Sequence, residues 1–143
     1  HPSRALAILT KAIDDADRRL GVEPSGTLLL NAGWAALDCE VPEQAAYWFD
    51  RALNESPRVV QFFLAEAASG ASATLCRLGV PGARGHSAAA AELCRRQGVP
   101  VFPRLTAAVD AAAASTGGAD GDLEGGHVSR WVAVRDEELI NPI

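Results

Sequence analysis

The stretch GHSAA, at residues 85–89, is the pattern in the sequence that comes nearest to a catalytic nucleophile. The motif G-x-S-x-G exposes a nucleophilic serine at a sharp turn between a strand and a helix. Here the final glycine is missing, and GVPGAR stands where the strand would have to be. No histidine and acid can be assigned as partners of the serine. We therefore expect Ser87 to be structural, as the N-cap residue of a helix.

Metal chemistry has one candidate pattern, DGDLEG at residues 120–125, which has the acidic spacing with which a calcium loop begins. Such a loop needs a bidentate glutamate where this chain has Trp131, and it needs flanking helices. The three histidines, His1, His86 and His127, do not have the spacing of zinc ligands. The sequence therefore predicts no metal site and no cofactor, and it favours a protein that is not an enzyme.

Composition limits the partners of the chain. Its 143 residues are 48% hydrophobic and 22% charged, which is typical of one globular domain. The formal charge of −5 and the absence of a basic stripe exclude a nucleic-acid surface. No run reaches the roughly 20 apolar residues that span a bilayer, so we expect no membrane partner. Three widely spaced cysteines indicate a reducing compartment, and we expect a cytoplasmic protein.

The elements that must carry any site are mostly helices, since alanine is very common and apolar residues recur at steps of three and four. The run TLLL that begins at Thr27 fits a strand or a helix, and the helix formers after Leu30 favour a helix. VPVF, at residues 99–102, reads as a short extended piece. The sequence predicts helices over residues 3–20, 27–37, 42–56, 58–78, 86–97 and 104–115.

Five residues in or directly after the second and third predicted helices have the spacing of a packed helical hairpin: Gly33, Ala45, Phe49, Ala52 and Pro57. Through them, residues 26–59 resemble a tetratricopeptide repeat, a helix–turn–helix unit of about 34 residues. In this resemblance Gly33 and Ala45 let the two helices approach closely, and Phe49 fills the gap between them. Ala52 allows the next helix to pack, and Pro57 ends the second helix.

The resemblance also implies a function. In this family the first helix of each unit lines the ligand-facing side, which here carries Asn31, Trp34, Leu37 and Asp38. The alternative for Trp34 is a position in the hydrophobic core. Asn31 matches a position that in some members helps to bind the terminal carboxylate of a peptide. We therefore expect a scaffold or adaptor that binds a peptide or protein partner in a helical groove, with an oligomer or a heteromer left open.

A second resemblance leads to a different protein. The order SRALAILTKAIDDADRRLG, GTLLLNAGWAALD, FFLAEAASGASATLCRLGVPG is similar to the N-terminal half of a thiolase-fold ketosynthase. It implies an α/β half-fold that is truncated, catalytically inactive and the partner of a polyketide or fatty-acid synthase. Residues 27–32 separate the two interpretations, because they are a strand in the second and a helix in the first.

The domain organisation that we expect is simple. Residues 1–115 form a helical domain with the hairpin at residues 26–59. Residues 116–126, TGGADGDLEGG, have the composition of a linker, and residues 127–143 form a C-terminal strand and tail.

Overall fold

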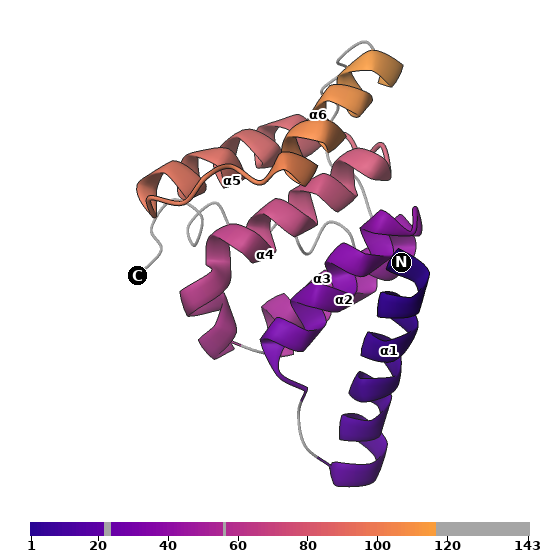
Figure 1. Ribbon diagram of the computed structural model, residues 1–143. Helices are drawn as coiled ribbons and strands as arrows, with labels where there is room; N and C mark the ends of the chain where they lie inside the picture. Colours follow the sequence, from indigo (N-terminus) through magenta and orange to yellow (C-terminus); the bar gives the residue numbers. More distant parts are fainter. Residues whose placement is uncertain (22–23, 56, 117–143) are drawn as a thin grey trace.

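The computed structural model describes residues 1–21, 24–55 and 57–116, and in this part of the chain it contains six α-helices, one π-helical turn and no strand (Figure 1). The prediction of a mostly α-helical domain is confirmed. The predicted linker beyond Thr116 and the predicted C-terminal strand lie outside the described residues. The helices are α1 (Pro2–Asp15), α2 (Gly26–Asp38), α3 (Pro42–Glu55), α4 (Pro57–Arg77), α5 (Ala83–Arg96) and α6 (Pro103–Thr116), with the π-helical turn η1 (Ala16–Leu20) after α1.

The start of α2 decides between the two interpretations of the sequence. Residues 27–32 are helical, because Ser25 lies in extended backbone and its Oγ accepts a hydrogen bond from the Leu28 N–H at 3.2 Å. This side chain provides a hydrogen-bond acceptor for one of the first backbone N–H groups of the helix, which have no acceptor within the helix. The α/β half-fold of a thiolase-like protein needs a strand at this position, so that alternative is wrong for the fold.

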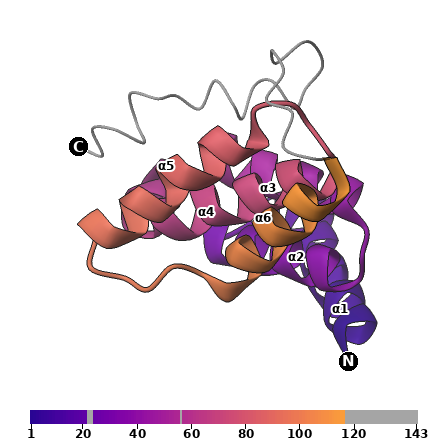
Figure 2. The same ribbon diagram turned by 90° about the horizontal axis from the view of Figure 1, so that it is seen from above.

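The helices pack mainly against their neighbours in the sequence, from α1 on α2 through to α4 on α5. In addition, α4 packs against α2 on one side and α6 on the other. Figures 1 and 2 show the result: α4 lies between the α2–α3 hairpin and α5, and α6 lies beside α4 with its first turn next to α2. Contact between α5 and α6 is slight compared with the contact that each makes with α4. These two helices therefore depend on α4 for their positions.

The side chain of Phe49 on α3 is fully buried between two glycines. A Cβ atom added to Gly33 on α2 would lie 2.7 Å from the ring, and one added to Gly70 on α4 would lie 2.3 Å from it. Both distances are shorter than real carbon contacts, so neither position has room for a side chain. The prediction that Phe49 fills the hairpin and that Gly33 permits close approach is confirmed. Gly70, on α4, is the second wall of the same site.

We expect Gly70→Ala to lower the free energy of unfolding by about 1–3 kcal/mol, because the added methyl group displaces the Phe49 ring. Gly85→Ala is the matched control. Gly85 also lies inside a helix, but nothing lies within 4 Å of its Cβ position, so the substitution should stabilise the protein by about 0.5–1 kcal/mol. Chemical denaturation measures both. Combining Gly70→Ala with Phe49→Leu should cost less than the sum of the two changes, and strict additivity would contradict the packing described here.

Candidate functional site

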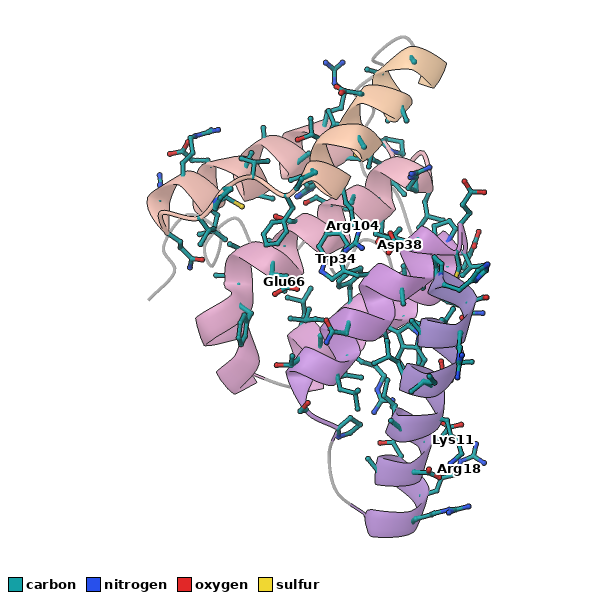
Figure 3. All side chains as sticks on the ribbon, viewed as in Figure 1. Lys11, Arg18, Trp34, Asp38, Glu66 and Arg104 are labelled. Atoms are coloured by element: carbon teal, nitrogen blue, oxygen red, sulfur yellow. The ribbon has the colours of Figure 1, made fainter. Side chains whose placement is uncertain are left out.

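Trp34 lies where α2, α4 and the start of α6 meet (Figure 3). Its ring is stacked on Phe102, with 5.9 Å between centroids and 25° between planes, and it contacts Phe49 edge-on at 5.4 Å. The indole Nε1 donates a hydrogen bond to Glu66 Oε1 at 3.1 Å. Trp34 is only 5% exposed, so its apolar surface is buried, and its one polar atom has a hydrogen-bond partner within the protein.

Arg104 covers the same ring from the start of α6 (Figure 3). Its guanidinium carbon is 5.3 Å from the Trp34 ring centroid, and its Nη2 donates a hydrogen bond to Asp38 Oδ2 at 2.6 Å. The cation–π contact and the ion pair both join the first turn of α6 to α2. We call the five residues Trp34, Asp38, Glu66, Phe102 and Arg104 the Trp34 latch.

The four residues predicted to contact a partner do not share one environment. Asn31 and Asp38 are exposed on α2, although Asp38 is paired with Arg104. Leu37 is 9% exposed and belongs to the core. Of the two positions that the sequence leaves open for Trp34, the structure shows the core one, because Phe102 and Arg104 of the same chain cover the ring. Binding of a partner at these positions stays a prediction.

An open groove lies between α5 and α6, with a volume of about 340 Å³. It exists because both helices pack on α4 and scarcely touch each other. Short side chains on α5 keep it open, and branched apolar side chains line the opposite wall. The α5–α6 groove is lined by Arg84, Ser87, Ala88 and Ala91 on one side and by Val101, Leu105, Thr106, Val109 and Asp110 on the other.

Two opposite charges stand on the two walls of this groove. Arg84 on α5 and Asp110 on α6 are both exposed, and neither forms an ion pair within the described part of the chain. The apolar lining between them is typical of a surface that buries apolar side chains of a ligand. The two charges can orient that ligand and select its charge pattern.

Ser87 lies at the base of the groove and is buried. Its Oγ donates a hydrogen bond to the Ala83 carbonyl at 2.8 Å and lies 3.3 Å from Cys76 Sγ. The prediction that Ser87 is an N-cap is wrong: α5 begins earlier, at Ala83, because Gly82 adopts a left-handed φ of 81° and takes the N-cap position. A structural role for Ser87 fits these contacts, since they hold its hydroxyl against a carbonyl and a thiol.

A second hydroxyl and thiol meet across the same pair of helices, where Ser69 Oγ lies 3.6 Å from Cys94 Sγ. Both pairs are buried. Burial raises the pKa of the Cys76 thiol, against the smaller lowering effects of the Ser87 hydrogen bond and the Arg84 charge. Burial therefore disfavours the thiolate, which is the reactive form of a cysteine.

Within the described ranges, no three histidine, cysteine, aspartate or glutamate side chains lie close enough together to hold a metal ion. None of the described helices combines the length and apolar character needed to cross a membrane. A further hollow of about 540 Å³ lies between α1 and the turn from α2 to α3, and its lining includes Cys39.

The chain matches no protein-family model, no curated protein sequence and no solved structure. The hairpin of α2 and α3 has the close packing that its residue spacing predicts, but no repeat family is assigned to it. Function is therefore inferred from the geometry of the latch and the groove.

The two buried tryptophans provide a test of the latch. Trp34 Nε1 is bonded to Glu66, whereas Trp48 Nε1 is buried without a hydrogen-bond partner among the described residues. Trp34→Phe therefore loses a bond to a carboxylate, and Trp48→Phe removes an unsatisfied donor. We expect Trp34→Phe to cost about 1–3 kcal/mol more than Trp48→Phe in denaturant unfolding. Equal costs would show that the Glu66 bond does not contribute to the stability of the latch.

Thiol reactivity provides a test of the buried pairs. In the native full chain we expect Cys39, which is partly exposed, to react with a disulfide reagent well before Cys76 and Cys94, which are buried. The raised pKa of Cys76 means that the folded state holds its proton more tightly than the unfolded state. The protonated thiol therefore contributes fully to the free energy of unfolding below the ordinary thiol pKa of about 8.5. This contribution is lost as the pH rises from that value through the raised pKa of the folded state. Rapid modification of all three thiols in the native chain would contradict this assignment.

Proposed function

We propose that the protein is a non-enzymatic interaction module that binds a segment of a protein or peptide partner in the α5–α6 groove. The observation that carries the proposal is the groove itself: an apolar surface with a volume of about 340 Å³, bordered by Arg84 and Asp110, which form no ion pair with any other described residue. Surfaces of this kind bury the apolar side chains of a bound segment, and their charged borders fix its direction.

The latch has a supporting role in this proposal. The first turn of α6 is attached to α2 through Phe102 and Arg104, so the latch sets the position of one wall of the groove. Trp34 and Asp38 then affect partner binding indirectly, because they position the α6 wall of the groove. Leu37 acts through the core behind them. Asn31, which is exposed on α2, remains a predicted contact for a larger partner.

The geometry around Ser87 favours binding over catalysis. The hydroxyl is buried, donates a hydrogen bond to the Ala83 carbonyl and lies 3.3 Å from the Cys76 thiol. A nucleophilic serine needs a base that can take its proton and an approach for the substrate. Binding in the groove requires neither a base nor access to Ser87, because burial of apolar surface supplies the binding free energy.

A peptide library displayed on phage and selected on the immobilised full chain tests the proposal. Selected peptides are then measured by fluorescence anisotropy against wild type, Ala88→Glu and Ala107→Glu. Both alanines are exposed on helices, but Ala88 lines the groove and Ala107 does not. We expect Ala88→Glu to weaken binding at least about tenfold, because it places a charge on the apolar wall, and Ala107→Glu to leave it unchanged. Peptides that bind both variants equally well would place the interaction elsewhere and overturn the proposal.

A further inference from the structure

The α5–α6 groove has specific requirements for an occupant. The occupant must offer a short apolar run that fits between alanines on one wall and Val101, Leu105 and Val109 on the other. It must also carry a positive charge for Asp110 and a negative charge for Arg84, since neither residue has an ion-pair partner in the described part of the chain. A purely apolar segment would leave both charges partly desolvated without compensation, which costs binding free energy.

The chain itself contains a segment with this chemistry. Residues 131–138, which lie outside the described residues, read WVAVRDEE in the sequence. Four uncharged residues with one large aromatic come first, then one arginine, then three acids. We propose that residues 131–138 bind in the α5–α6 groove of the same molecule, so that an external partner has to displace them. This inference rests on the proposed function and names how that site is regulated.

The order of charges in the segment suits the two walls. In the sequence, Arg135 directly follows the apolar run, and its charge is opposite to that of Asp110. The acids that come directly after Arg135 are opposite in charge to Arg84 on the other wall. An apolar anchor supplies most of the affinity in such an arrangement, and the charges fix its direction.

The connection to the groove permits this arrangement. Helix α6 ends at Thr116, six positions beyond the groove residue Asp110. The chain from Thr116 to Trp131 can span at most about 50 Å when extended, so its length does not limit access to the groove. A tether of this length holds the segment at an effective concentration of the order of millimolar, so that even weak intrinsic affinity gives high occupancy.

The test uses the full chain and a fluorescein-labelled synthetic peptide of residues 127–140 as the probe. In the double variant Trp131→Ser, Val132→Ser the tethered segment loses its apolar anchor, and the groove becomes free. Leu139→Ser, Ile140→Ser is the matched control, because it removes two apolar residues from the same tail outside the proposed segment. We expect the peptide to bind the double variant at least about tenfold more tightly than wild type and the control. Adding Ala88→Glu to the double variant should abolish that binding.

Hydrogen exchange provides an independent readout on the same proteins. Amides of residues 101–109 should exchange faster in the double variant than in wild type, because the segment no longer covers them, and the control should match wild type. Circular dichroism of all the variants establishes that the helices are intact.

Two other outcomes would overturn the inference, and they differ in what they say of the proposed function. If the peptide binds wild type and the double variant equally, and Ala88→Glu abolishes both, the groove binds segments of this chemistry but is not occupied by its own tail. The proposed function then stands without this regulation. If the peptide fails to bind the double variant at about 100 µM and exchange is unchanged, the groove does not accept this segment. The proposed function is then decided by the phage-selected peptides alone.

Discussion

The ring of Phe49 fixes the distance between α2 and α4, because it fills a space whose walls are the backbones at Gly33 and Gly70. Two helices held one aromatic ring apart have little freedom to slide or separate without opening a cavity. The position of Trp34 follows, since its ring packs edge-on against Phe49. The position of α6 follows from Trp34 in turn, through Phe102 and Arg104. One side chain on α3 therefore determines where both walls of the groove stand, although it lies in neither.

Much of the fold could be predicted from the sequence, because amphipathic spacing is a local property. The helices begin and end within a few residues of their predicted limits. The spacing of Gly33 and Phe49 within one hairpin also predicts that the two residues pack together. Gly70 shows where this reasoning stops. By helix propensity alone, a glycine inside a helix lowers the stability of that helix. Gly70 is favourable here because it leaves room for the ring of Phe49, which lies 21 positions earlier in the sequence. The N-cap assigned to Ser87 failed for a related reason, since GVPGAR reads as a break although Gly82 and Ala83 start the helix.

The candidate site was less accessible to sequence reasoning. The resemblance to a tetratricopeptide repeat implies a partner-facing side that carries Asn31, Trp34, Leu37 and Asp38. A resemblance within one hairpin cannot show which of these residues the rest of the chain covers. Phe102 and Arg104, which contact Trp34, lie about 70 positions later in the sequence, and no sequence pattern links the two regions. The groove left no local signal either. Its α5 wall is a run of alanines, which indicates only a helix, and its existence depends on how two helices diverge on a third.

The pair Asp38 and Arg104 is separated by 66 positions, whereas the packing from α1 to α5 joins neighbours in the sequence. Contacts between neighbours close short loops and form early in folding, and contacts between distant segments wait until their partners are in place. We therefore expect helix α6 to dock after α2 and α4 have come together, which would complete the second wall of the groove last. If α6 is also among the elements that open first in the native state, a segment bound against it shifts that local equilibrium towards the closed form.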